Sequence, residues 1–245
     1  MHSKNTDKMK KIITVIVFAI LIVACATEKN GNMVVQGKIE GLKKGTLYLQ
    51  KMKDTVLISV DSVAILGDNT YRLVDNIDAP ELFFLTFEGS NAKERILFFG
   101  EEGVITINDK IEKFGLSPEI SGSKNQVVLD KFNKINRRFV NQRLDFIQKD
   151  FEAKKSGDEA VMKKLDADYN KLTRRRVLFV ANYAISNADF EAAPYIGITE
   201  LYNASTQMLD TVNNSFSEKI KNSVYGKRFN EYVTNIKKNE SVVKQ

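Results

Sequence analysis

The chain of 245 residues carries 37 Lys and Arg against 31 Asp and Glu, a formal net charge of +6, and 43% of its residues are hydrophobic. That composition is ordinary for a folded chain, and the length is enough for one or two cores. With one His and one Cys in the whole chain, a disulfide framework and a multi-Cys or multi-His metal site are excluded.

The N-terminal segment reads as a secretory signal peptide over residues 1–24. Lys8, Lys10 and Lys11 form a basic start, and an apolar run of twelve residues follows over 12–23, interrupted only by Thr14. A helix needs about 20 apolar residues to cross a membrane, whereas signal peptides use about 7–15. The sequence "MKKIITVIVF" is a complete signal start in itself, so Met9 competes with Met1 as the initiator.

The only cysteine follows this run directly. The residues Ile22-Val23-Ala24-Cys25 resemble the lipobox of bacterial lipoproteins. The resemblance implies cleavage between Ala24 and Cys25, a diacylglyceryl group on the Cys25 thiol, and an acylated new N-terminus. The alternative is an ordinary buried cysteine. Two or more acyl chains hold a protein stably on a bilayer, and we expect residues 25–32 to form a lipidated, flexible tether.

Removal of residues 1–24 changes which chemistry is open to the protein. His2 leaves with the signal and Cys25 is modified, so the mature chain has neither an imidazole nor a free thiol. Ser-His-Asp and Cys-His catalysis need an imidazole, and zinc and copper sites draw on His and Cys. We therefore expect no enzyme, no metal and no cofactor, with carboxylate-only catalysis left open.

The charge balance also shifts on cleavage. Four Lys and one Asp leave with the signal, so the mature net charge falls to +3. This is too weak to indicate nucleic acid as a partner. The residue after the cysteine is Ala26 rather than Asp, which in Gram-negative sorting favours the outer membrane, facing the periplasm.

The first part of the mature chain, residues 33–122, has the pattern of a β-rich domain. Short apolar or alternating runs are separated by turn residues, and the connections "EGLKKG", "LGDN", "EGSNAK" and "GEEG" look like hairpin turns. Short strands at spacings of ~8–12 residues without intervening helices predict an antiparallel β-sandwich or barrel.

The second part, residues 123–245, changes to a helical period. Val128, Phe132, Ile135, Phe139 and Phe146 form one apolar stripe, and a second stripe runs from Val161 to Tyr183. Between them, Gly157 is a candidate helix end and Asp158 a candidate N-cap. We predict a long antiparallel helical hairpin, then shorter helices, with Pro194 in a first turn. The fold class is therefore α+β, and the absence of a Pro/Ser linker predicts that the two parts pack together.

Segments of both parts, taken in order, resemble one family. They are similar to lipid-anchored disulfide oxidoreductases of Bacteroidetes, in which a β-domain of unknown function precedes a thioredoxin fold. The resemblance covers about residues 33–236, and the segments "APYIG" and "NSVYGKRFNEYV" extend it into the helical part. The matching β-domain positions are Gly37, Asp61-Ser62, Gly67, Tyr71, Pro80, Glu101 or Glu102 with Gly103, and Gly122-Ser123 with Asn125. No Cys-x-x-Cys follows in this sequence, so the family's redox activity does not carry over.

Three charged clusters are candidate sites. Glu101 and Glu102 are adjacent, so on a strand they point to opposite faces and we expect a charged turn rather than an acid–base pair. Arg174 to Arg176 sweep about 200° around a helix, which indicates a solvated flank with one salt bridge rather than an anion clamp. Asp166 and Asp168 lack metal-binding spacing.

Aromatic residues are dense on two neighbouring strands. Phe83, Phe84, Phe87, Phe98 and Phe99 cannot all share one face. We expect packing against the helices; the alternative is an exposed surface for a partner.

The function expected from the sequence is that of a non-catalytic, lipid-anchored envelope protein that serves as an interaction or scaffolding module, with a protein or peptide partner. The second hypothesis is a binding accessory to a thioredoxin-like redox system, which a groove between the two parts lined by Phe and Tyr would favour. The third is a carboxylate enzyme, which needs a pocket joining two carboxylates, one of them in an apolar setting.

Overall fold

A computed structural model describes residues 29–90 and 94–243 of the protein, without the side chains of 241–243. The predicted signal peptide (1–24), the cleavage site at Ala24 and the predicted lipidation residue Cys25 lie outside the described residues.

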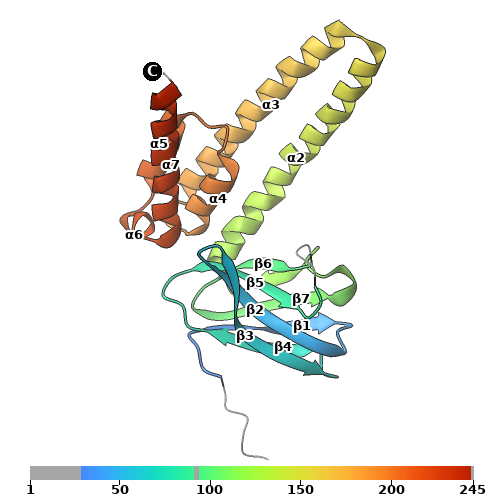
Figure 1. The fold of residues 1–245 in the computed structure, drawn as a ribbon, viewed down its shortest axis with the longest axis vertical. Coiled ribbons are helices and arrows are strands. Elements are labelled where there is room, and N and C mark those ends of the chain that lie inside the picture. The colour runs from blue at the N-terminus through green and yellow to red at the C-terminus, as the bar shows by residue number, and fades with distance from the viewer. Residues whose placement is uncertain (1–28, 91–93, 244–245) are drawn as a thin grey trace, which may run out of the picture. The chain divides into compact units, whose positions relative to one another are not determined.

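The β-domain is made of two four-stranded sheets (Figure 1). The first has the strand order β4-β1-β7-β8 and the second the order β3-β2-β5-β6. The bounds are β1 Met33–Glu40, β2 Lys44–Lys53, β3 Val56–Leu66, β4 Thr70–Asp75, β5 Glu81–Phe87, β6 Ile96–Gly100, β7 Gly103–Lys110 and β8 Glu119–Ser121, with a 3-10 turn η1 at Ile111–Lys113. This confirms the predicted α+β class with a sandwich-like N-terminal domain.

One strand pair departs from the antiparallel prediction. β1 pairs antiparallel with β4 on one side but parallel with β7 on the other, with Met33 opposite Gly103. Three of the four connections expected to be hairpins, "EGLKKG", "LGDN" and "GEEG", instead lead from one sheet to the other. A short turn looks the same in the sequence whether the next strand pairs with the last one or crosses to the facing sheet, so the direction of pairing was not readable.

The space between the sheets is filled by the inward side chains of both. Large apolar residues there are fully buried, among them Phe83, Phe98, Met33, Leu47 and Leu73. Tyr71 of β4 belongs to this core, and its hydroxyl donates to the Ile107 carbonyl of β7, in the same sheet, at 2.9 Å. Gly37 permits the close approach of β1 and β7, because a Cβ there would lie 1.9 Å from the Ile107 carbonyl oxygen.

Six helices follow, and the first two form the predicted antiparallel hairpin. α2 runs over Lys124–Ser156 and α3 over Glu159–Ser186. Gly157 ends α2 in the left-handed region at φ 70°, and the Asp158 side chain accepts from the Val161 N–H, as their residue types predicted. The remaining helices are α4 Ala192–Glu200, with Pro194 in its first turn, α5 Thr206–Ser215, α6 Glu218–Lys221 and α7 Val224–Val243.

The helices share a second apolar core, and it includes residues of the sheet. Phe99 of β6 is fully buried in this core, and Leu82 of β5 packs against it. The β-rich and helical parts therefore pack together, as expected from the missing linker. The predicted stripe of α2 is wrong at Ile135, which is 39% exposed, because the neighbouring Asn136 is the buried residue and accepts from the Arg176 Nε at 3.0 Å.

Candidate functional site

An aromatic cluster, which includes a hydrogen-bonded tyrosine, joins β5 and β6 to α4 and α7. The Phe99 ring meets Tyr195 at 5.7 Å and Tyr225 at 5.8 Å, both in edge-on geometry. The Tyr225 hydroxyl accepts from the Leu82 N–H at 3.0 Å. Burial raises the pKa of Tyr225 to about 12, so its hydroxyl stays neutral across the physiological range.

The start of α2 is fixed by side chains that the sequence presented as catalytic or turn candidates. The Ser123 hydroxyl accepts from the Gln126 N–H at 3.0 Å, which caps the helix. The Glu101 carboxylate accepts from the N–H groups of Lys124 and Asn125 and, at 2.7 Å, from the Asn125 Nδ2. Glu102 is exposed. The two glutamates therefore do not act together, and Glu101 stabilises a helix N-terminus.

The same turn of α2 also binds the backbone of its neighbours. Gln126 Oε1 accepts from the Phe99 N–H at 2.9 Å, and Asn125 Oδ1 accepts from the Ala192 N–H at 3.1 Å. Both side chains are buried. Because these bonds satisfy backbone donors that burial would otherwise leave unpaired, the polar residues here serve the fold.

A groove of about 690 Å³ lies where the edge strands β6 and β8 meet α2. We call it the junction groove. Four basic side chains line it, Arg95, Lys134, Arg137 and Arg138, against one carboxylate, Asp130, whose pKa is raised by burial. Its apolar lining is aliphatic, including Ile96, Leu97, Leu116, Pro118, Ile120 and Leu129. It contains no Phe or Tyr among the described residues, unlike the groove that the second hypothesis requires.

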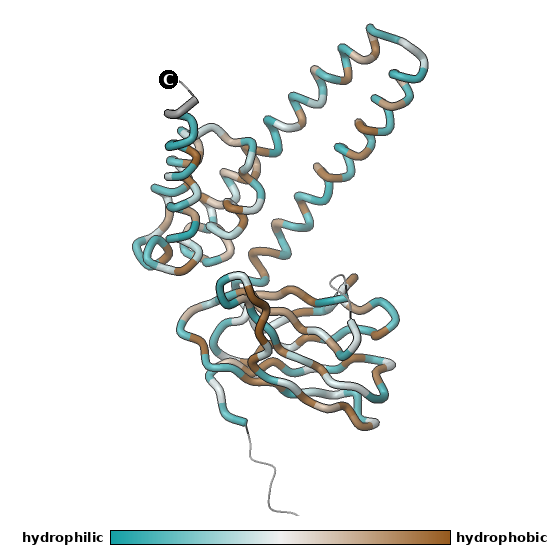
Figure 2. Tube along the Cα trace, viewed as in Figure 1, coloured by the Kyte–Doolittle hydropathy of each residue, from teal (hydrophilic) through white to brown (hydrophobic). Residues whose placement is uncertain are grey.

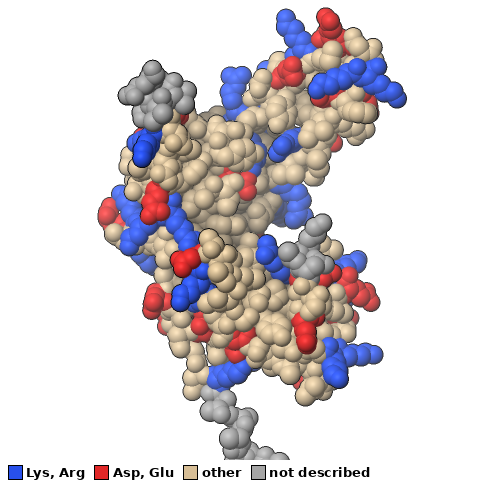
Figure 3. Space-filling view, in the orientation of Figure 1, with Lys and Arg blue, Asp and Glu red and all other residues tan. Residues whose placement is uncertain are grey.

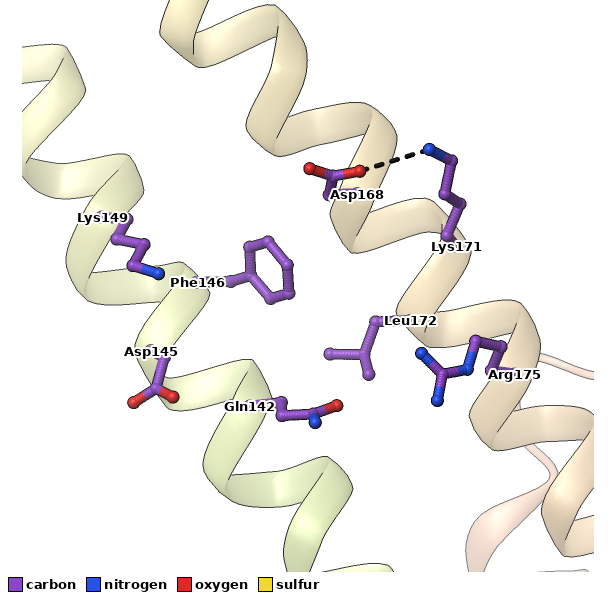
Figure 4. Close-up of a pocket in the computed structure, with 8 residues that line it drawn as sticks. All are labelled: Gln142, Asp145, Phe146, Lys149, Asp168, Lys171, Leu172 and Arg175. Carbon is purple, nitrogen blue, oxygen red and sulfur yellow. Dashed lines mark hydrogen bonds and ion pairs between the residues drawn. The ribbon is translucent and has the colours of Figure 1, made fainter.

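A smaller pocket of about 370 Å³ lies between the two helices of the hairpin (Figure 4). Phe146 of α2 and Leu172 of α3 point into it, and charged side chains surround them. It brings Asp145 and Asp168 to one pocket, but Asp168 pairs with the Lys171 Nζ at 3.3 Å. A carboxylate that is ion-paired at a solvated rim is not in the apolar setting that carboxylate catalysis requires.

The three consecutive arginines diverge, as their helical spacing predicted. Arg175 lines the pocket of Figure 4, while the Nε of Arg174 donates to the Asn170 carbonyl one turn back. Arg176 pairs with the Glu200 carboxylate and contacts Asn136. They form one salt bridge and no shared anion site.

The aromatic residues of β5 and β6 divide between the two cores. Phe83 and Phe98 face the sandwich and Phe99 faces the helices, all fully buried. Phe84 is half-buried beneath Arg95, whose guanidinium lies 4.6 Å from the ring, and half-buried Phe87 meets Phe114 edge-on at 5.2 Å. Packing against the helices is confirmed for Phe99, and none of the five forms an exposed partner surface.

The strongest exposed apolar feature lies on α2 and was missed in the sequence. Val140, Leu144, Ile147 and Phe151 are 44%, 59%, 52% and 71% exposed. Their +4, +3, +4 spacing places them within about 60° of the helix circumference. Figure 2 shows apolar positions recurring along this part of α2 between hydrophilic ones. We call these four residues the α2 stripe. The same +4, +3, +4 spacing is present in the sequence, beside the aromatic stripe that faces α3.

The described residues contain no group of His, Cys, Asp and Glu arranged to bind a metal ion. Among the same residues, no helix is both long and apolar enough for a transmembrane span.

Two facing sheets followed by a helical region define an α+β protein with a sandwich-like N-terminal domain. Residues 33–129 match a family model described as "Domain of unknown function (DUF4369)", which confirms the resemblance of the β-domain to a domain of unknown function. The match covers the whole sandwich and ends in the first turns of α2. No curated protein and no solved structure gives a match.

Proposed function

We propose that the protein is a lipid-anchored module of the bacterial cell envelope that acts by binding another protein rather than by catalysis. The observation that carries the proposal is the α2 stripe. Four large apolar side chains in one line are exposed on a helix that already has its own packing partner. Exposed apolar patches of this kind mark interaction sites, and an apolar helix face is a common recognition element.

The hairpin does not need the α2 stripe for its own stability. α2 and α3 are joined by a separate series of aromatic contacts: Phe132 with Phe179 at 5.6 Å, Phe139 with Phe179 at 5.4 Å, and Phe146 with Tyr169 at 6.2 Å. Phe139 and Phe146 lie about 80° to 120° around the helix from Val140 and Ile147. Because the stripe contributes little to this packing, its exposure is best explained by a partner.

Attachment to the envelope rests on the lipobox at Cys25. If the anchor is correct, the Cys25→Ser variant loses incorporation of labelled fatty acid and leaves the membrane fraction, because no acyl chain then holds it. Fatty-acid labelling and membrane fractionation of the full chain measure this. Incorporation of the labelled fatty acid by the variant at the level of the unchanged chain would contradict the anchor.

Binding through the hairpin is tested with a photo-crosslinking amino acid placed at Leu144 of the full chain in intact envelopes. Adducts to protein are expected from this position. The matched control is Leu178 on α3, which is 51% exposed but outside the stripe. Equal, low adduct formation at both positions would remove the support for an interaction module.

A second candidate is the accessory to a thioredoxin-like redox system. The junction groove lies between the two parts, as this hypothesis predicts, but its lining is aliphatic and basic instead of the predicted Phe and Tyr. Its volume of about 690 Å³ and its position beside two sheet edges suit an extended peptide. A photo-crosslinker at Leu116, 75% exposed in this groove, would then capture a thioredoxin-like protein.

A further inference from the structure

The charges beside the α2 stripe define what partner it fits. The +4, +3, +4 spacing is that of core positions in a coiled coil. Arg143 and Asp150 flank the stripe on the side of α3, and Asn141 and Gln148 flank it on the other side. Lys154 and Arg137 occupy the next core positions at either end, so charge limits the apolar contact to four layers.

An antiparallel copy of α2 complements this surface in each layer. When the two helices are related by a twofold axis between residues 145 and 146, Val140 faces Phe151 of the other copy and Leu144 faces Ile147. The same symmetry places Arg143 opposite Asp150 twice, and Asn141 opposite Gln148 twice. A parallel pair would instead place Arg143 opposite Gln148, so the Arg143–Asp150 pair would not form.

We propose that the α2 stripe is the contact between two copies of this chain, packed as an antiparallel pair of hairpins. This inference names the partner of the proposed interaction module. It rests on the proposed function, because the lipid anchor is what places two copies on one membrane. The stripe is about 16 Å long, so the contact is weak in dilute solution. Two copies tethered to one membrane have a high effective concentration, which makes a short contact sufficient.

The neighbouring surface of α3 is shaped to take part. A groove of about 310 Å³ runs between the helices beside Ile147, bordered by Arg143 and Asp150 of α2 and by Leu165 and Tyr169 of α3. Side chains of the second copy enter such grooves in helical bundles. The charge over the loop end of the hairpin is of mixed sign (Figure 3), whereas a helix lying on anionic lipid is rich in Lys and Arg on its polar face.

The test is disulfide cross-linking of the full chain in envelopes, with Leu144→Cys and Ile147→Cys carried by differently tagged copies expressed together. The mixed pair is expected to cross-link several-fold more than Leu144→Cys with itself, because the antiparallel arrangement brings 144 and 147 together. Leu178→Cys is the exposed control and should give background. The wild-type chain, whose only cysteine is Cys25, shows any cross-link that forms through that residue. Such a cross-link would mean that the Cys25 thiol is free, so a failure of lipidation is detected separately.

Charge reversal then tests the flanking pairs. Arg143→Glu and Asp150→Arg should each lower the mixed cross-link several-fold, and the two together should restore it. The proposal is overturned if the mixed pair cross-links no more than Leu178→Cys does, which is also the result expected if the stripe lies on lipid. It is also overturned if Leu144→Cys cross-links preferentially with itself. Photo-adducts at Leu144 to a different protein only would overturn the second copy as the partner and leave the interaction module standing.

Discussion

Glu101 shows how one side chain can look like a site and serve a helix. Its carboxylate binds three N–H donors at the start of α2, where the helix dipole favours negative charge. The sequence predicted a charged turn at Glu101, whereas the carboxylate caps a helix that begins 23 positions further along the chain. Only the fold distinguishes these two roles.

Glu101→Ala is expected to lower the free energy of unfolding by about 1–2 kcal/mol, because it removes a cap and a charged hydrogen bond. Glu102→Ala, next to it and exposed, should change it by less than about 0.5 kcal/mol. Urea unfolding of both variants measures the difference. Equal effects would mean that the carboxylate does not stabilise α2.

Glu191 is a buried carboxyl, only 3% exposed. Ser223 Oγ lies 2.6 Å from Glu191 Oε2 and 2.7 Å from the Ile220 carbonyl oxygen, and it accepts from the Gly226 N–H. One hydroxyl proton cannot serve both oxygens, whereas a protonated Glu191 can donate to Ser223. Burial raises the pKa of Glu191, which agrees with this arrangement.

A raised carboxyl pKa makes the folded state bind more protons than the unfolded state, so stability falls as pH rises from the ordinary carboxyl pKa through the folded one. Glu191→Gln keeps an oxygen for Ser223 and removes the ionisation. We expect the variant to gain stability over wild type as pH rises from 5 to 8. Thermal unfolding across this range measures the difference in stability between variant and wild type, with Glu231→Gln at an exposed position as the control. A difference that does not change with pH would show that Glu191 is not the titrating group.

At the scale of elements, the tie between β5 and α7 is a single hydroxyl. Tyr225→Phe keeps the ring against Phe99 but leaves the Leu82 N–H without its acceptor. An unsatisfied buried donor costs about 1–3 kcal/mol, so this variant should be destabilised by that amount in urea unfolding.

The control for this variant comes from the same aromatic cluster. The Tyr195 ring also contacts Phe99, but its hydroxyl has no hydrogen-bond partner within the part of the chain that the structure describes. Tyr195→Phe should therefore be close to neutral. If Tyr225→Phe is as close to neutral as Tyr195→Phe, the rings rather than the hydrogen bond join the sheet to the helix.

The elements differ in how far their sequences determined them. The hairpin was predictable because Gly157 and Asp158 are local signals that end one helix and begin the next. The direction of β1 beside β7 was not, because it depends on residues about 70 positions apart. The α2 stripe lay within reach of the sequence, but only the structure shows that α3 covers Phe139 and Phe146 and leaves Leu144 exposed.

For the whole molecule, the predicted class and the two-part arrangement are confirmed, and the match over residues 33–129 supports the β-part. The outcome differs between the predicted sites. Cys25 lies outside the described residues, and its lipidation stays a prediction. The charged clusters have structural roles that follow from partners far along the chain, such as Glu200 for Arg176, and such partners cannot be read from local spacing.

The position of β1 has a consequence for how the protein is made. β1 is synthesised first, yet both of its neighbours, β4 and β7, come later, and the register with β7 joins Met33 to Gly103. Such non-local pairing gives the domain a high contact order, and closing these loops slows folding. If residues 1–24 act as the predicted signal peptide, slow closure of the sandwich would keep the chain extended for longer, which is the state that export requires.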